Sequence, residues 1–384
     1  MKIGFFNSSK TLSKVGFSDY TSNPGIGGTE YVTMRILYQL ANKNDKHEFY
    51  LLSYENVVNE TNLQNLHIVE PQVAPLDVCV IPKSQYAIYK NSERKDIRPI
   101  IWSHHPHDEI DEAIPEAIFL GDYHCYSNRK FTGKKYIIKN PAPKPLNFTD
   151  KVDAPYKFVY LGAIGPAKGL HHILKFWPRI KQINPKARLS IIGGDLYGEG
   201  KSNSQNFIPV TGKYGHRLKK LMSRMKKCER ESIFFHGLVS DIEKNAILRH
   251  SHIALLNPTG KSEAAPASPL ECYCYGIPVI AAGDYGAYDN MRVFPELDLK
   301  KKKIESIISF ISNPESYEVV SERSKAYAKK LYGENEIELE KWINLFDKKL
   351  DTPEIDLPYK FRMKISFRDV FLRTFKYPLR SIMK

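Results

Sequence analysis

The chain has 384 residues and a formal net charge of +14, and its apolar and aromatic content is that of a globular protein. At this length we expect two domains of ordinary size. The chain holds no run of eighteen apolar residues, and Met1–Phe6 passes into polar sequence too early for a signal peptide, so we expect the protein in the cytoplasm. Five scattered cysteines with no Cys-x-x-Cys spacing give no sign of a disulfide framework or a zinc site, while the charge indicates an anionic partner, namely a nucleotide diphosphate, a nucleic acid or an anionic membrane.

The first predicted elements are a strand, a glycine loop and a helix. Ile3 to Asn7 is expected as the opening strand, and a long polar loop follows it as far as Gly27 and Gly28. After Glu30, apolar residues recur on one helical face: Val32, Ile36, Leu37, Leu40 and Ala41. Glycines let the backbone approach a phosphate, whose charge the helix N-terminus favours. The same glycines could also serve only to turn the chain.

Short apolar runs alternate with helical segments through the rest of the first half, which is typical of a parallel α/β sheet. We expect strands at His47–Ser53, Leu66–Val69, Val78–Ile81, Pro99–Trp102, Cys125–Asn128 and Tyr136–Ile138. Three histidines, His104, His105 and His107, follow the strand at Pro99–Trp102 and lie at its carboxyl end, where open α/β sheets bind ligands. A metal site is the alternative interpretation of this histidine cluster, but an irregular loop lacks the one-face spacing of a zinc-binding helix.

The second half repeats the plan of the first. After a proline-rich linker at Lys139–Pro145, the sequence predicts a strand at Phe158–Leu161, a glycine turn at Gly162, and a helix that starts after Lys168 and runs through Phe176. A lysine ordered at such a helix start can neutralise a diphosphate leaving group. Further along we expect a strand at Ala187–Gly194 and a strand with a turn at Ile233–Leu238, followed by an apolar run at Ile253–Leu256. Between them we expect a long loop at Tyr197–Gly215 and a basic surface helix within Arg217–Arg230 that could instead bind phosphates.

Two glutamates, Glu263 and Glu271, lie eight positions apart in the segment before Gly276. The first falls in a loop rich in proline and small residues, and the second begins a run that can wind as a helix until Gly276 stops it. Pro269 suits the first turn of that helix because no N–H is needed there, so the other free amides can face an anion. Two surface acids at this spacing are the alternative interpretation.

In this order and spacing, the motifs resemble those of retaining glycosyltransferases of the GT-B class, glycosyl transferases group 1 type, whose donor site carries a Glu-x7-Glu motif. The resemblance covers the chain from Lys2 to about Arg292. It implies two Rossmann-like α/β domains that face a central cleft. An acceptor-side domain would span residues 1–145, a nucleotide-sugar-binding domain 152–335, and a final helix with a basic tail 336–384, the helix returning toward the first domain.

The resemblance also implies roles for particular residues. Glu263 would lie beside the sugar, which His104 or His105 would reach; Lys168 would meet the diphosphate and act in catalysis, and Glu271 would accept from the ribose hydroxyls. The other donor-binding residues would be Gly27, Gly28, Gly162, Gly237, Leu238, Ala267, Ser268 and Leu270.

This sequence departs from the family pattern at one diphosphate cation, because Ala163 stands where the family has arginine. Another base, such as Lys261, would have to compensate, or the donor would be held differently, or activity would be weak. Pro141 also replaces the family glycine at the end of the first domain, and Pro266 and Pro269 lie in a segment that is glycine-rich in the family.

The implied function is transfer of a sugar from a UDP-sugar or GDP-sugar to an acceptor hydroxyl with retention of configuration, in bacterial cell-surface polysaccharide or lipid-linked glycan assembly. No metal and no other cofactor is expected, since no Asp-x-Asp pair lies near the proposed site. A catalytically weak or inactive sugar-nucleotide-binding subunit is the alternative, which the missing arginine would fit. A nucleic-acid partner is not expected, because no aromatic-basic recognition module is apparent.

The last stretch, residues 359–384, carries eight lysines and arginines against one acid, interleaved with aromatic and aliphatic residues. Basic charge with aromatic anchors is what an anionic lipid leaflet attracts, so we expect peripheral attachment to the inner face of the cell membrane. The alternative is that these apolar residues dock on the first domain.

Overall fold

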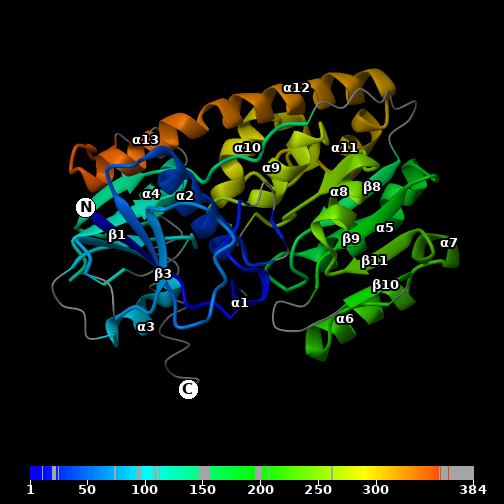
Figure 1. The fold of residues 1–384 in the computed structure, drawn as a ribbon. Helices are drawn as coiled ribbons and strands as arrows, with labels where there is room; N and C mark the ends of the chain where they lie inside the picture. The colour runs from blue at the N-terminus through cyan, green and yellow to red at the C-terminus, as the bar shows by residue number, and fades with distance from the viewer. Residues whose placement is uncertain are drawn as a thin grey trace, which may run out of the picture.

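The computed structural model describes residues 1–10, 12–19, 23–24, 26–72, 75–92, 97–106, 108, 110–111, 113–146, 156–194, 201–205, 207–260, 263–353, 355 and 362. They form two α/β domains, each built on one sheet in which many of the strands are joined through helices (Figure 1). Repeated strand-helix units place successive strands parallel, because a helical crossover returns the chain to the same end of the sheet.

The first domain contains a seven-stranded sheet in the order β3-β2-β1-β4-β5-β6-β7, and every strand pair in it is parallel. The strands are β1 Lys2–Phe6, β2 Glu48–Leu52, β3 Leu66–Val69, β4 Val78–Pro82, β5 Arg98–Trp102, β6 Glu116–Phe119 and β7 Lys134–Ile137. The helices are α1 Leu12–Val15, α2 Gly28–Lys43, α3 Tyr86–Lys90 and α4 Asp122–Ser127. Continuous apolar runs such as β4, buried along its whole length, are those of a sheet covered on both faces.

The strand expected at Cys125–Asn128 is wrong, because this segment lies in α4, which begins at Asp122. An aspartate in the first turn is favoured by the positive end of the helix dipole, and the Cys125 amide donates to the Gly121 carbonyl at 2.9 Å. The preceding apolar run instead supplies β6, which the sequence did not predict.

The second domain contains a six-stranded sheet in the order β10-β11-β9-β8-β12-β13, and only β10 is antiparallel to its neighbour. The strands are β8 Lys157–Leu161, β9 Arg188–Ile192, β10 Lys201–Gln205, β11 Ile233–Gly237, β12 Ile253–Leu255 and β13 Val279–Ile280. The helices are α5 Leu170–Ile183, α6 Gly212–Ser223, α7 Lys227–Arg230, α8 Asp241–Arg249, α9 Ala267–Cys274, α10 Tyr288–Val293, α11 Ile304–Ile311, α12 Pro314–Gly333 and α13 Asn335–Phe346.

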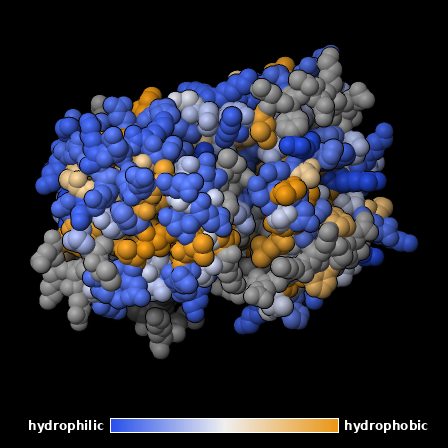
Figure 2. All heavy atoms as spheres, in the orientation of Figure 1, coloured by the Kyte–Doolittle hydropathy of each residue, from blue (hydrophilic) through white to orange (hydrophobic). Residues whose placement is uncertain are grey.

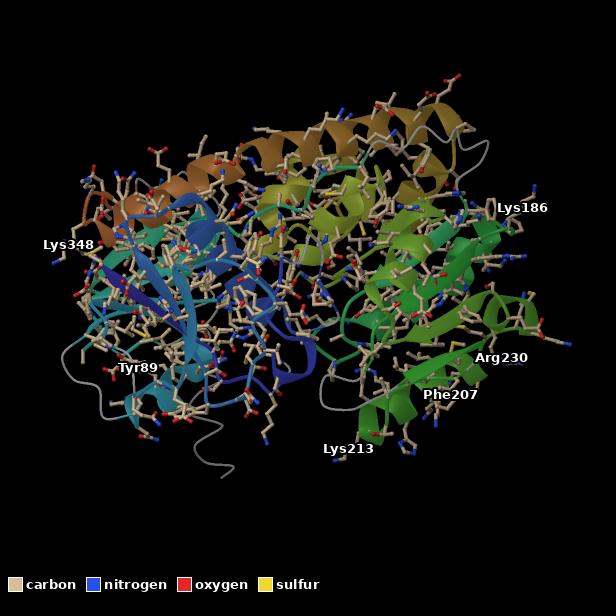
Figure 3. The ribbon with its side chains drawn as sticks, in the orientation of Figure 1. Tyr89, Lys186, Phe207, Lys213, Arg230 and Lys348 are labelled. Carbon is tan, nitrogen blue, oxygen red and sulfur yellow. The ribbon has the colours of Figure 1, made fainter. Side chains whose placement is uncertain are left out.

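The long loop expected at Tyr197–Gly215 is wrong at residues 201–205 and at residues 212–215, where α6 already begins. Residues 201–205 form β10, because the backbone of β11 offers an edge to pair with and this outweighs the low strand propensity of serine and asparagine. The basic segment that follows forms α6 and α7, and its apolar residues Leu218 and Met222 are buried. Lys186 and Arg230 lie on the side of this domain farthest from the first domain, and Lys213 lies at its lower end (Figure 3).

The last described helices return from the second domain to the first, and α12 and α13 run along the top of both in Figure 1. Trp342 of α13 is 1% exposed and packs on the first-domain core, with ring centroids 5.5 Å from Phe5 and 5.0 Å from Trp102. Hydrophilic residues dominate the face in Figure 2, where hydrophobic residues gather in small groups. Among the described residues, no helix is long and apolar enough to cross a membrane.

We predict that Trp342→Ala lowers the free energy of unfolding by about 3–5 kcal/mol, because it removes a fully buried indole and leaves a cavity between Phe5 and Trp102. Urea denaturation followed by circular dichroism would measure this loss. Ile337→Ala on the same helix is the control, since that side chain is 56% exposed and its removal should change stability by less than about 0.5 kcal/mol. Equal effects of the two substitutions would contradict the packing described here.

Candidate active site

Glycines line the carboxyl edge of the second sheet. Gly162, Gly193 and Gly237 follow or end β8, β9 and β11 and have φ values of 148°, 139° and 71°. The Gly193 amide donates to the Gly237 carbonyl at 2.8 Å, and a Cβ on Gly193 would lie 2.0 Å from the Gly162 oxygen. Backbone without side chains at this edge leaves room for a ligand to approach closely. Gly162 and Gly237 were predicted site residues. Gly193 was not predicted as a site residue, because the sequence analysis placed it at the end of a strand.

Lys168 and Glu263 are far apart in the sequence but in contact in the structure. Lys168 lies in the turn before α5, and Glu263 lies in the loop before α9. The Lys168 Nζ forms an ion pair with the Glu263 carboxylate, and the two side chains are 30% and 19% exposed. The Gly286 amide donates to the Glu263 carbonyl at 2.8 Å, which fixes this loop. Two predicted catalytic residues thus share one partly exposed site.

The N-terminus of α9 lies close to this pair. The helix begins at Ala267, earlier than the run expected from Glu271, so Glu271 falls in its second turn. Pro266 occupies the N-cap position in an extended conformation, and no side chain among the described residues caps the helix. The amides of Ala267 and Ser268 therefore stand at an uncapped helix start, where an anion is favoured, while Pro269 offers no N–H. Gly276, with a φ of 65°, closes the turn that follows the helix, as expected.

Glu271 has a partner that the sequence analysis did not name. Its Oε2 lies 2.8 Å from the Nζ of Lys244 in α8, and the two side chains are only 13% and 8% exposed. Burial lowers the pKa of Lys244, but the neighbouring carboxylates of Glu271 and Asp241 outweigh it and raise the pKa above its ordinary value. Lys244 is buried together with Leu248, four residues later. That helical spacing was the signal that this lysine faces inward.

The first-domain glycine loop reaches the second domain at this point. Gly27 is the N-cap of α2 and Gly28 its first residue, and a Cβ on Gly28 would meet no atom within 4 Å. The Asn23 side chain holds the loop, accepting from the Ile26 amide and donating to the Ile26 carbonyl at 2.9 Å each. Lys244 Nζ donates to the Asn23 carbonyl oxygen at 3.1 Å. The two predicted glycines therefore lie at the start of α2, directly after the loop whose Asn23 contacts the second domain.

The histidines lie at the carboxyl end of β5, as expected, and differ from one another. The His105 side chain is exposed, whereas the His104 ring packs on Trp102 with centroids 4.4 Å apart. His104 Nε2 is buried and has no hydrogen-bond partner among the described residues. Burial, together with the neighbouring His124 and His105, lowers the pKa of His104 to about 3. The imidazole of His104 is therefore neutral near pH 7.

Asp108 fixes the backbone of this histidine loop. Its Oδ2 accepts from the amides of His104 and His105 at 3.3 and 3.2 Å and from the Ser103 hydroxyl at 2.8 Å. His124 Nε2 lies 2.9 Å from the His105 carbonyl oxygen. One carboxylate and one buried imidazole thus determine how the two predicted histidines are presented.

A cavity of about 410 Å³ lies between the two domains on the linker side of α9. Residues from both domains and from the linker line it, among them Arg35, Asn140, Ala267, Leu270, Glu271 and Arg292. Lys168, Glu263 and the edge glycines do not line it. The cavity therefore adjoins the candidate site through α9, and its size falls in the range of small-molecule pockets.

Two parallel-sheet α/β domains, with a glycine-lined sheet edge and a helix N-terminus at the site, have the GT-B fold, and solved structures agree. The chain matches WaaG, described as a glycosyltransferase involved in lipopolysaccharide biosynthesis, at 12% identity and a TM-score of 0.55, covering 89% of this chain and 99% of that one. It matches the OtsA trehalose-6-phosphate synthase at 10% identity and a TM-score of 0.59, covering 91% and 100%. The TarM structure from S. aureus, in complex with UDP, matches at 14% identity and a TM-score of 0.50, covering 70% and 55%.

Residues 146–327, most of the second domain, match the family model "Glycosyl transferases group 1", so the chain carries a glycosyltransferase domain of this group. The predicted resemblance to group 1 glycosyltransferases of the GT-B class and the predicted fold class are thereby confirmed. The chain spans only about 55% of the length of TarM, and no curated protein matches it. That Ala163 stands where the family has arginine stays a prediction, and Lys261, the base expected to compensate, lies outside the described residues.

We predict that His104 makes the protein less stable in acid. Because its folded pKa of about 3 lies below the usual value near 6.5, its contribution is complete above pH 6.5 and is lost as the pH falls toward 3, at up to about 1.4 kcal/mol per pH unit. Urea unfolding at several pH values between 6.5 and 4 should therefore show a smaller loss for His104→Asn than for the wild type. The exposed His216→Asn is the control. Identical pH dependence in wild type and His104→Asn would refute the assignment.

Proposed function

We propose that the protein is a retaining glycosyltransferase that moves a sugar from a nucleotide diphosphate sugar, UDP-sugar or GDP-sugar, to an acceptor hydroxyl. The observation that carries the proposal is the pairing of Lys168 with Glu263 beside an uncapped helix N-terminus and a glycine edge. A departing diphosphate needs positive charge and free amides close to the bond that breaks, and these residues supply both.

In this proposal the donor lies along the carboxyl edge of the second sheet. The base would lie at Gly237 and Leu238, the ribose at Glu271, and the diphosphate at Lys168, at Gly162 and at the amides of Ala267, Ser268 and Leu270. Leu238 is 44% exposed, which leaves an apolar surface that a base can cover. Lys168 would exchange its Glu263 partner for the diphosphate, which would free Glu263 to accept from sugar hydroxyls.

The first domain would complete the site from the other side. Gly27 and Gly28 would lie over the diphosphate, and His104 would face the sugar as a neutral hydrogen-bonding group. His104 is preferred to His105 because its Nε2 lacks a partner in the described part of the chain, whereas the exposed His105 is held only through its backbone. A neutral imidazole can donate one hydrogen bond and accept another, which suits a hydroxyl partner.

For the acceptor we propose a glycan or lipid-linked acceptor in the assembly of bacterial cell-surface polysaccharide. This rests on the similarity to WaaG and on the basic tail. A catalytically weak or inactive sugar-nucleotide-binding subunit is the second candidate, favoured by Ala163, because one cation fewer stabilises the leaving diphosphate. Formation of a glycoside by the purified chain would decide between the two.

We predict that Lys168→Ala and Glu271→Ala each weaken nucleotide diphosphate binding by about 1.5–3 kcal/mol, because each removes a hydrogen-bond partner that is charged and partly desolvated. Isothermal titration calorimetry with UDP and with GDP would measure the change. Lys186→Ala, at the outer side of the second domain (Figure 3), is the control and should bind as the wild type does. Unchanged affinity in both site variants would remove Lys168 and Glu271 from the donor site.

Apart from Arg362, residues 359–384 lie outside the part of the chain that the structure describes. We propose that they hold the protein at the inner face of the cell membrane, since each lysine or arginine near an anionic surface contributes about 1 kcal/mol. Removing them should abolish co-sedimentation with anionic liposomes while nucleotide binding persists. A full-length chain that fails to sediment with such liposomes at low salt would make a non-membrane acceptor the better hypothesis.

A further inference from the structure

Lys244 is a buried lysine with three acceptors around its Nζ, and they come from three separate segments. Glu271 Oε2 of α9 lies at 2.8 Å, Asp241 Oδ1 of its own helix at 3.0 Å, and the Asn23 carbonyl oxygen of the first-domain loop at 3.1 Å. The Lys244 side chain is 8% exposed. A lysine this deeply buried needs compensation for its lost hydration, and these three oxygens provide it.

The ammonium has no hydrogen left for a further partner. A lysine ammonium carries three N–H donors, and the three acceptors use all of them. Lys244 is therefore not the missing diphosphate cation that Ala163 leaves open, although it is a buried cation beside the candidate donor site. Its effect on a bound nucleotide must pass through Glu271 or through the first-domain loop.

The surroundings of Lys244 leave Glu271 little freedom. Asn245 donates to Asp241 Oδ2 at 3.1 Å, and the Tyr275 hydroxyl donates to Asn245 Oδ1 at 2.8 Å, so α8 is tied to the end of α9. With Oε2 of Glu271 engaged by Lys244, the other carboxylate oxygen remains for a hydroxyl ligand. The carboxylate also lines the interdomain cavity, so it is within reach of a ligand there.

We propose that Lys244 is a positioning residue that orients Glu271 toward the ribose of the donor and joins this orientation to the first-domain loop at Asn23. The proposal rests on the function proposed above. It adds a source of specificity for the ribose, since a carboxylate that is held through one oxygen presents its second oxygen in a fixed direction. A first domain that moved away would remove the Asn23 carbonyl from Lys244, so the ribose contact is complete only when the domains are together.

The alternative is a structural role alone, in which the buried ion pair supports the fold and any loss of binding is indirect. The two roles differ in their effect on ribose recognition. If Lys244 only supports the fold, its removal weakens the binding of UDP and of 2′-deoxy-UDP equally. If Lys244 orients Glu271, its removal weakens the binding of UDP more than that of 2′-deoxy-UDP, because only UDP has the 2′-hydroxyl that would donate a hydrogen bond to Glu271.

The experiment compares the dissociation constants of UDP and 2′-deoxy-UDP by calorimetry for the wild type, Lys244→Met and Lys244→Gln. In the wild type, loss of one hydrogen bond to a charged group should make the deoxy analogue about tenfold weaker. In Lys244→Met the ratio should fall close to one, and in Lys244→Gln, whose amide keeps one donor, it should lie between. Lys227→Met, an 80% exposed lysine of α7, is the matched control and should keep the wild-type ratio.

Each outcome decides the question. A wild-type ratio that persists in a folded Lys244 variant overturns the positioning role, and the glutamine variant, which keeps a polar partner, serves if the methionine variant does not fold. A wild type that binds UDP with a ratio of one leaves Glu271 without its ribose role, and that failure belongs to the proposed function. If UDP does not bind, GDP and 2′-deoxy-GDP replace it; if neither nucleotide binds, the proposed function fails and this inference fails with it.

Discussion

Parallel strand pairing is the constraint on which the site depends. In a parallel sheet every strand ends at the same edge, so the loops after the strands gather there whatever their separation in sequence. Gly162, Gly193 and Gly237 come together at one such edge and His104 lies at the other. Glu263 approaches from the loop that leads into α9. The buried apolar runs that build the sheets therefore determine where the polar residues meet.

The lysines near the site are paired with acidic residues. The sequence carries a net charge of +14, yet basic residues such as Lys186 and Arg230 lie on the side of the second domain farthest from the first. Near the site, Lys168 and Lys244 are both paired with the glutamates of the Glu-x7-Glu motif. The two pairs differ in burial, since Lys168 is 30% exposed and Lys244 only 8%. An exposed pair can exchange partners when an anion arrives, whereas a buried and saturated pair keeps its geometry.

Sequence periodicity predicted most strands and the two-domain plan, because hydrophobic runs of strand length leave a clear pattern. It failed at Cys125–Asn128 and at residues 201–205, where the outcome depends on a helix cap and on an available sheet edge. The candidate site residues were named from the resemblance to the glycosyltransferase family, and their roles stay predictions. Lys244 could not be named, because its acceptors lie at positions 23, 241 and 271, and only the fold brings these together.

The return of α13 to the first domain has a consequence for biosynthesis. Trp342 fills the core beside Phe5 and Trp102, so residues near the start of the chain await a partner made more than two hundred positions later. Domains generally fold as units from the N-terminus while the ribosome still holds the chain. Here the apolar surface beside Phe5 and Trp102 stays uncovered until Trp342 has been translated. That interval gives chaperones a binding surface, and it makes the nascent chain vulnerable to premature termination.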